Sequence, residues 1–256
     1  MAPAPDDVIM QHAVWAALKG EILNWYGGPA TAAAARTAGF NTERIPSRWR
    51  GLEADVRTEM ESLQPRLVLD VGCGYGGMST YLALRYPQAE VVGVDVSDRF
   101  FGCAARAIQS HPVPNLTFRS GDLRSLGPQE GCDLLLLVNV VNYLTDGAEL
   151  RRVLSEAVAS LSPHGWVCVH TPQRWSFREP FTKLPAVGWL PDGLRERLVA
   201  RSGRRSTMRD IRLPRAGEIA RALRRGGATE IRRHPAPRKA FKESHVTLWA
   251  RRGGSS

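Results

Sequence analysis

The first part of the chain alternates apolar and polar residues with a helical period. From Asp6 to Tyr26 apolar side chains recur at near-helical spacing, and the segment from Gly27 to Pro29 ends the pattern. An Ala-rich stretch from Thr31 to Gly39 follows, and a second helix is predicted from about Ser47 to Leu63. We expect residues 1–63 to form a helical cap on the domain that follows.

From residue 64 onward the pattern changes to short apolar runs typical of buried strands, separated by helical segments. Strands are predicted at 66–71, 90–95, 115–119, 133–139, 165–171, 229–234 and 245–252, and helices at 76–85, 97–109, 146–161 and 216–225. Such alternation indicates parallel strands joined by right-handed crossovers. The sequence therefore predicts a doubly wound, mainly parallel, seven-stranded α/β sheet in a domain spanning 64–256.

A segment rich in proline and aromatic residues interrupts this alternation after the fifth strand. Residues 172–213 contain four prolines together with Trp175, Phe177, Phe181 and Trp189. A connection of this length inside a compact domain usually carries a function or is disordered. Its aromatic content favours an ordered lid inserted into the domain.

The segment from Leu69 to Gly77 reads LDVGCGYGG and joins the first predicted strand to the next helix. Glycines at such a junction allow a tight turn and let a ligand approach backbone N–H groups. Gly72, Gly74 and Gly77 also satisfy GxGxxG, the fingerprint of dinucleotide-binding domains. The loop by itself therefore leaves open which nucleotide it binds.

Acidic residues near the ends of three successive strands indicate which kind of nucleotide ligand the loop binds. Asp70 lies at the end of the first strand, Asp95 ends the second, and Asp122 follows the third. A carboxylate at Asp70 would crowd a pyrophosphate but suits a cationic amine, whereas Asp95 suits ribose hydroxyls. Asp122 suits the amino group of adenine. The three acids favour a nucleoside that carries an ammonium and a sulfonium group over a polyphosphate.

Four motifs in this region resemble those of the class I S-adenosylmethionine-dependent methyltransferases. They read LDVGCGYGG, GVDVS, SGDL and LSPHGWVCV, and the resemblance extends from about Leu67 to Thr171. It implies the Rossmann-like fold of that family, S-adenosyl-L-methionine as the cofactor and methyl transfer as the activity. An NAD-binding or nucleotide-free Rossmann-like domain is the alternative.

The resemblance also implies which residues contact the cofactor. Asp70, Gly72, Cys73, Gly74 and Gly76 would frame the methionyl moiety, Asp95 and Val96 the ribose, Asp122 and Leu123 the adenine, and Asn139 and Val140 would offer backbone groups near the sulfonium. The small size of Cys73 at a crowded turn accounts for its presence without a catalytic role.

Methyl transfer from a sulfonium needs alignment of the acceptor above all, since the leaving group is already attached. A general base is needed only when the acceptor is protonated, as phenols and alcohols are. His170, at the end of the fifth strand, is the candidate base, with a packed histidine hydrogen-bonded to a loop carbonyl as its alternative interpretation. His245, with Glu243 nearby, is the second candidate or an ordinary strand-edge residue. No metal is required.

Aromatic and basic residues after the fourth and fifth strands indicate an acceptor site. The expected substrate contacts are Tyr143, Arg174, Trp175, Phe177, Arg178 and Trp189. The TPQRWS segment resembles quinone and natural-product O-methyltransferases. We therefore expect O-methylation of a small natural-product, quinone-like or lipid-like acceptor, with N- or C-methylation as the alternative. The run from Leu184 to Leu190 also suits contact with a membrane surface.

The net charge of +10 is concentrated in the last third of the chain. Residues 174–256 carry 21 basic and 7 acidic side chains, whereas residues 1–173 carry 14 basic and 18 acidic ones. The excess favours an anionic group on the acceptor or an anionic surface nearby. It also keeps rRNA or tRNA methylation as an alternative, although NVVNY follows the fourth strand in place of the [DNS]PP[YFW] signature of many base-amino methyltransferases.

The spacing of the cysteines and the lengths of the apolar runs predict the cellular compartment of the protein. The four cysteines, Cys73, Cys103, Cys132 and Cys168, are scattered without a CxxC pair, so neither a zinc site nor a disulfide framework is expected. The amino-terminal residues lack the basic start of a signal peptide, and the longest apolar run, Leu134 to Val138, is too short to cross a bilayer. We expect a reduced, cytoplasmic enzyme without a transmembrane segment, whose oligomeric state the sequence leaves open.

Overall fold

The computed structural model describes residues 3–28, 31–126, 131–144, 146–173, 177, 184–202, 211–234 and 245–253. The chain divides into two compact units, Met1–Leu136 and Leu137–Ser256. Within the described residues, no helix is both long enough and apolar enough to cross a membrane. The predicted division into a cap over 1–63 and a domain over 64–256 stays a prediction.

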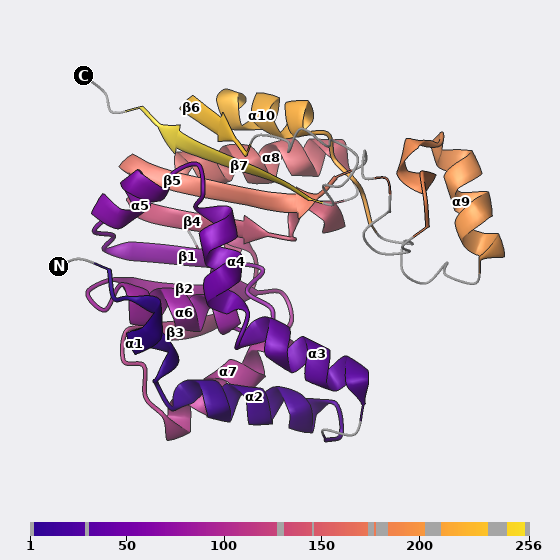
Figure 1. Ribbon diagram of the computed structural model, residues 1–256. Coiled ribbons are helices and arrows are strands. Elements are labelled where there is room, and N and C mark those ends of the chain that lie inside the picture. Colours follow the sequence, from indigo (N-terminus) through magenta and orange to yellow (C-terminus); the bar gives the residue numbers. More distant parts are fainter. Residues whose placement is uncertain are drawn as a thin grey trace. The chain divides into compact units, whose positions relative to one another are not determined.

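Among the described residues, five helices precede the first strand of the first unit (Figure 1). They are α1 (Asp6–Met10), α2 (Val14–Trp25), α3 (Ala32–Asn41), α4 (Ile45–Leu52) and α5 (Arg57–Ser62). The helix predicted over 6–26 is interrupted after Met10, and the one predicted over 47–63 is split between α4 and α5. The Ala-rich stretch forms α3, which Thr31 caps by accepting a hydrogen bond from the N–H of Ala34 at 3.1 Å.

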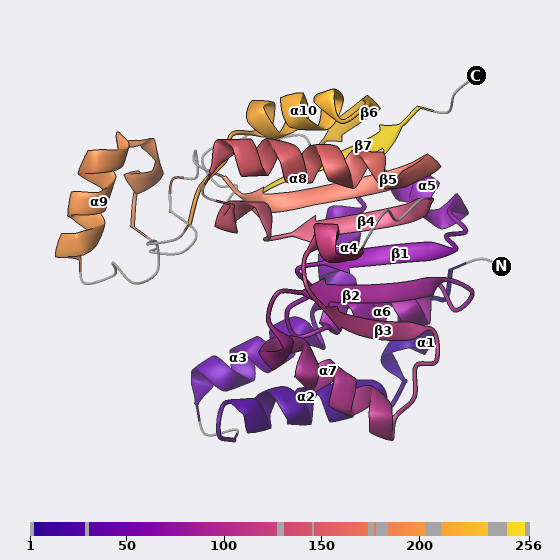
Figure 2. The ribbon, with the colours of Figure 1, turned by 180° about the vertical axis from the view of Figure 1, so that it is seen from behind.

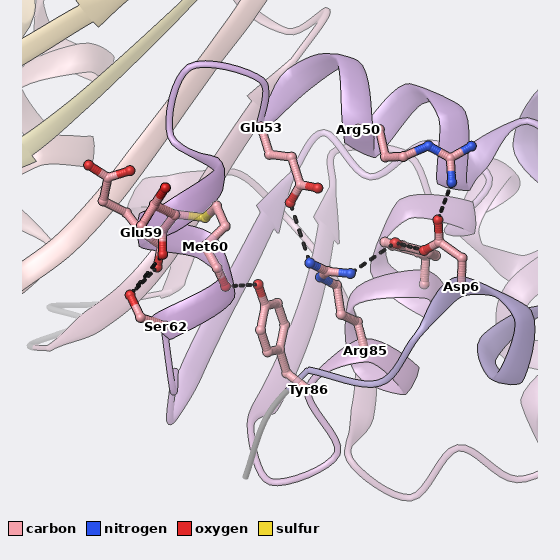
Figure 3. Close-up of polar contacts among 10 residues, drawn as sticks. Asp6, Arg50, Glu53, Glu59, Met60, Ser62, Arg85 and Tyr86 are labelled. Carbon is pink, nitrogen blue, oxygen red and sulfur yellow. Dashed lines mark hydrogen bonds and ion pairs between the residues drawn. The ribbon is translucent and has the colours of Figure 1, made fainter.

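A partly buried polar network links α1 and the end of α4 to α6 (Gly77–Arg85) (Figure 3). Arg85 on α6 lies 3.4 Å from Glu53, which follows α4 and is only 4% exposed. The hydroxyl of Tyr81, also on α6, donates to Asp6 of α1 at 2.5 Å, and Asp6 pairs with Arg50 of α4. Burial is the main reason why the pKa of Glu53 lies above its usual range. Glu53 follows the last residue of α4, so the contact with Arg85 lies at the break between α4 and α5.

Three parallel strands of the sheet lie wholly within the first unit. They are β1 (Leu67–Val71), β2 (Glu90–Asp95) and β3 (Leu116–Ser120), with α6 following β1 and α7 (Asp98–Ser110) following β2. Asp70 lies opposite Gly93, and Asp95 lies opposite Ser120. Because parallel strands end at one edge of a sheet, the glycine loop after β1 and the acid that ends β2 meet there.

The second unit contains the end of β4 (Cys132–Val138) and the elements that follow it. They are α8 (Gly147–Ala159), β5 (Leu161–Pro172), α9 (Asp192–Arg201), α10 (Ala216–Arg225), β6 (Ala228–Arg233) and β7 (His245–Arg252), with short 3-10 turns at Val141–Tyr143 and Val187–Trp189. β7 pairs antiparallel with both β5 and β6. Helices α8 and α10 lie side by side (Figure 2), with Leu154 and Leu223 among their buried residues.

The hydrogen-bonded strand order is β3-β2-β1-β4-β5-β7-β6 in one seven-stranded sheet. This order reverses after β1, as in doubly wound folds, and the last strands close the sheet in antiparallel fashion. The predicted mainly parallel, doubly wound α/β fold is therefore confirmed.

Candidate functional site

Three glycines give the loop after β1 a backbone that other residues rarely adopt. Gly72, Gly74 and Gly76 have positive φ angles of 75°, 54° and 76°. A Cβ atom at Gly76 would lie 2.5 Å from the Cβ atom of Ala104 and 2.8 Å from the ring of Phe118. At Gly74 a Cβ atom would meet nothing within 4 Å, so the space beside this turn is open. The loop combines a turn packed against α7 and β3 with room for a ligand.

The backbone N–H groups of this loop are largely engaged within the protein. Those of Gly72 and Cys73 donate to the carbonyl oxygen of Val94 at 2.6 and 3.0 Å, and that of Gly74 donates to Oδ2 of Asp95 at 2.9 Å. A pyrophosphate binds to this kind of loop through such N–H groups. The loop therefore suits a dinucleotide poorly, in agreement with the ligand predicted from the sequence.

Asp95 is held by two backbone N–H groups at the carboxyl end of β2. Its Oδ2 accepts from Gly74 and its Oδ1 from Ser97 at 3.1 Å. A carboxylate has about four lone-pair sites, so Asp95 retains the capacity to accept hydrogen bonds from a diol. The neighbouring Val96 is 77% exposed and packs against little of the protein.

Asp70 is a buried carboxylate at the end of β1. It is 2% exposed, and its Oδ2 accepts from the hydroxyl of Ser79 at 2.6 Å. Burial raises the pKa of Asp70 to about 6, whereas the hydrogen bond from Ser79 and the charge of Arg48 act in the opposite direction. Asp95 adds a smaller upward contribution to this pKa. Asp70 is thus a poorly solvated carboxylate two residues before the first glycine of the loop, and such an anion suits a cationic partner.

Arg48 is a residue near the glycine loop that the sequence interpretation missed. Its guanidinium lies 3.9 Å from the centre of the Phe40 ring, and burial lowers its pKa to about 10. The signal in the sequence was its spacing, since Arg48 falls on the helical stripe of α4 formed by Ile45 and Leu52, both buried. A charged side chain on the apolar face of a helix loses solvation, so it is usually stabilised by a charged or polar group nearby.

The loop also contacts an aromatic cluster that the sequence interpretation did not single out. Tyr75, Trp25, Tyr26 and Phe100 form this cluster, with ring centres 4.7 to 6.5 Å apart among its members. The hydroxyls of Tyr75 and Tyr26 lie 3.1 Å apart at hydrogen-bond distance. These rings come from α2, the loop and α7, so only the folded chain brings them together.

Asp122 lies beyond the end of β3 and forms an ion pair with Arg124. The backbone N–H of Arg124 donates to its Oδ1 at 3.0 Å, and the Nε of the same residue donates to Oδ2 at 2.8 Å. An adenine amino group at Asp122 would share the carboxylate with this arginine. The adjacent Leu123 is buried at 5% exposure, which suits a wall of an adenine site more than a polar contact.

In the second unit, Asn139 and Val140 follow β4. Asn139 has a positive φ of 59°, and its N–H donates to the carbonyl oxygen of His170 at 2.7 Å. Its buried Oδ1 has no hydrogen-bond partner among the described residues. A strained backbone together with an unsatisfied amide is a common mark of a functional position. Tyr143, a few residues on, is 59% exposed.

The two histidines proposed as bases lie next to each other. His170 on β5 and His245 on β7 stack with ring centres 4.9 Å apart and an interplanar angle of 2°. The Nδ1 of His170 lies 2.8 Å from the hydroxyl of Thr247, which fixes the orientation of the ring. Glu243 lies outside the described residues.

Only part of the predicted acceptor site is described. Arg174, Trp175 and Arg178 lie outside the described residues. Phe177 and Trp189 are 45% and 37% exposed, and their rings make an edge contact with centres 6.1 Å apart. Among the residues that the structure describes, no group of three His, Cys, Asp or Glu side chains is arranged to hold a metal ion.

Comparison with known proteins agrees with this geometry. Residues 68–165 match the family model described as a methyltransferase domain. This part of the chain is thus similar to a methyltransferase domain. The described residues would suit S-adenosylmethionine, since Asp70 offers a buried anion for an ammonium group and Asp95 retains acceptor capacity for ribose hydroxyls.

The chain is similar to curated proteins and to solved structures. It is 32% identical over 131 residues to a trans-aconitate 2-methyltransferase of Methylobacterium nodulans, covering 51% of this chain and 47% of that protein. An O-methyltransferase family protein from Burkholderia thailandensis is 21% identical with a TM-score of 0.55, covering 89% of this chain and 62% of that one. Human N-acetylserotonin methyltransferase in complex with SAM is 16% identical with a TM-score of 0.51, covering 97% and 68%. The chain spans about half the length of the curated relatives it matches.

Proposed function

We propose that this protein transfers the methyl group of S-adenosylmethionine to an oxygen atom of a small organic acceptor, and that the acceptor carries a carboxylate. The glycine loop and the strand before it support the first part of the proposal, because the loop N–H groups bind within the protein and Asp70 at the end of β1 is a buried carboxylate. The relatives named trans-aconitate 2-methyltransferase support the second part, since trans-aconitate is a small tricarboxylic acid.

S-adenosylmethionine, when bound, supplies an electrophilic methyl group together with its leaving group. The residues of this chain then have to bind the cofactor and the acceptor and to orient one toward the other. In the proposal Asp70 accepts hydrogen bonds from the ammonium group, and Asp95 accepts from the ribose hydroxyls. Asp122 and Leu123 contact the adenine. Fixing the reactants in this way converts a bimolecular encounter into a reaction within one complex, which is the main source of rate for such a displacement.

The nature of the acceptor decides whether a base is needed. A carboxylate is already ionised near neutral pH and attacks without losing a proton. A phenol or an enol, as in the quinone-like and natural-product acceptors, has to lose one. His170 would then take that proton, with Thr247 orienting its ring through Nδ1. The proposal of a carboxylate acceptor therefore predicts that His170 is dispensable for the main reaction.

The test is incubation of the full chain with methyl-labelled S-adenosylmethionine and defined acceptors. The panel contains trans-aconitate and related di- and tricarboxylic acids, phenolic and quinol compounds, small amines, and total tRNA and rRNA. We expect label in a carboxylic acid, as a methyl ester that releases methanol in mild base. Label in RNA or in an amine would overturn the acceptor class. Binding of NADH without binding of S-adenosylhomocysteine would overturn methyl transfer itself.

A further inference from the structure

Several buried polar atoms of the second unit have no hydrogen-bond partner among the residues that the structure describes. They are Oδ1 of Asn139, both side-chain atoms of the Asn142 amide, Oγ1 of Thr171 and Nη1 of Arg212. The side chains of Asn142 and Thr171 are fully buried, at 0% exposure. Because leaving a buried polar group without a partner costs free energy, a set of them in one region indicates that a bound molecule completes it.

Backbone hydrogen bonds hold these residues together near the ends of β4 and β5. The N–H of Asn139 donates to the carbonyl oxygen of His170 at 2.7 Å, which places the turn after β4 beside the end of β5. The N–H of Arg212 donates to the carbonyl oxygen of Asn142, also at 2.7 Å. Ligands of doubly wound folds bind beyond the carboxyl ends of the strands. The unsatisfied groups therefore lie where an acceptor is expected.

Two guanidinium groups approach Gly147, the first residue of α8. A Cβ atom at Gly147 would lie 3.3 Å from both Nη1 and Nη2 of Arg212 and 3.4 Å from Nη1 of Arg151. Arg212 pairs with Glu218 through Nη2 at 2.6 Å, whereas Arg151 forms no ion pair within the described part of the chain. Two cations around one point thus share a single carboxylate, and their mutual repulsion is relieved when an anion binds between them.

The start of α8 increases the positive potential at this point. The helix has 13 residues, and the amino-terminal end of such a helix carries a partial positive charge. The adjacent acid, Asp146, accepts from the N–H of Ala148 at 2.9 Å and so caps the helix. A carboxylate suits the two guanidinium groups because each of them presents parallel N–H donors to its two oxygens.

We propose that Arg151 and Arg212 bind a carboxylate of the acceptor other than the one that is methylated. The inference rests on the proposed function and narrows the acceptor to an acid with at least two carboxylates. Asn142, next to Arg212, offers an amide donor and acceptor to the same molecule. In the reaction an oxygen of the other carboxylate forms the bond to the methyl group, the bond from that carbon to sulfur breaks, and the sulfonium becomes a thioether, so no proton moves.

The test compares two acceptors that differ in the number of carboxylates. They are the di- or tricarboxylic acid of the panel that is methylated fastest, with trans-aconitate tried first, and crotonate, an unsaturated acid with one carboxylate. We expect the wild-type protein to favour the first over crotonate by about 100-fold or more in kcat/KM. In Arg151→Gln this ratio should fall by about 10-fold or more through a higher KM for the first acid, with its kcat within about twofold.

Arg152→Gln is the matched control, because Arg152 is the next residue of α8 and both side chains are exposed, so neither substitution disturbs the core. It should leave the ratio at its wild-type value. Arg151→Lys, which keeps the charge and loses the fork, should give a ratio between those of the wild type and Arg151→Gln. Gly147→Ala should also raise the KM for the first acid, since its methyl group would lie between the two guanidinium groups.

The outcomes separate this inference from the function on which it rests. If S-adenosylhomocysteine binds but no carboxylic acid of the panel is methylated, the proposed function fails and the inference fails with it. If the wild-type protein methylates both acids with equal kcat/KM, only the second carboxylate site is overturned. The same holds if Arg151→Gln keeps the full ratio, if Arg152→Gln lowers it equally, or if Arg151→Gln lowers kcat while KM stays unchanged.

Discussion

Affinity for S-adenosylhomocysteine should fall as the pH is lowered through about 6, because Asp70 has to be ionised to bind an ammonium group. Burial places the pKa of Asp70 at about 6, well above the ordinary value of 3.8. Hydrogen bonding to Ser79 and the charge of Arg48 limit this rise, and Asp95 adds to it. The ammonium and carboxylate groups of the ligand keep their charges throughout this range. Asp70 is thus the group expected to control the pH dependence of binding.

The size of the effect follows from the fraction of Asp70 that is ionised. With a pKa of about 6, that fraction is roughly nine tenths near pH 7 and roughly one tenth near pH 5. The apparent Kd for S-adenosylhomocysteine should therefore rise about ninefold over this interval, which corresponds to about 1.3 kcal/mol. The measurement is isothermal calorimetry of the full chain at several pH values and constant ionic strength.

Asp70→Asn provides the control for other groups that titrate in the same range, histidines above all. This variant should bind more weakly than the wild type near pH 7 and show a nearly flat Kd between about pH 5 and 7. A flat profile in the wild-type protein would refute the reasoning. A ninefold change that persists in Asp70→Asn would refute it too, because the responsible group would then lie elsewhere.

The stability of the ligand-free protein should respond in the opposite direction. The pKa of Asp70 is raised in the folded state, so its contribution to stability is fully present below the unfolded value near 3.8 and is lost as the pH rises through about 6. The Asp70→Asn variant cannot ionise at this position, so its stability does not fall in this way as the pH rises. The difference in melting temperature between Asp70→Asn and the wild type should therefore increase across this window in favour of the variant, as thermal melts at matched pH would measure.

Three further substitutions test the packing and the chemistry. Gly77→Ala should destabilise the protein by about 1–3 kcal/mol in urea unfolding, since the added methyl group would lie 2.1 Å from a backbone oxygen of α3, whereas Gly20→Ala in α2, where nothing lies within 4 Å, should be neutral or stabilising. Glu53→Ala should cost about 3 kcal/mol, because it leaves the buried guanidinium of α6 without its carboxylate, and a cost below about 1 kcal/mol would contradict the importance of that pair. His170→Gln should leave methylation of a carboxylic acid within about twofold while lowering that of a phenol by about 100-fold or more, and the exposed His164→Gln should change neither.

The sequence predicted those parts of the fold that depend on local patterns. The strands from β1 to β5 are marked by short apolar runs, and the turn after β1 by glycines whose positive φ angles only glycine adopts easily. Asp70 and Asp95 were found because strand ends are visible in the sequence, and parallel pairing then assigns them to one edge. The family and its cofactor followed from the same residues.

The remaining features depend on contacts between distant segments. The break between α4 and α5 follows Glu53, whose partner Arg85 is more than thirty residues away, so no helical period reveals it. The stacking of His170 on His245 depends on the antiparallel register of β5 and β7. Arg48 was missed because a lone arginine on an apolar stripe is ambiguous until its neighbours are known.

The contact between Gly77 and the end of α3 limits how the amino-terminal helices can be exchanged in protein engineering. A segment transplanted from a relative has to place a backbone oxygen against the same glycine and present an acid to Arg85. Chimaeras joined near residue 64 should therefore succeed only when both halves come from parents that share these two features. The amino-terminal helices and the glycine loop should therefore be exchanged together, although only loops connect them along the chain.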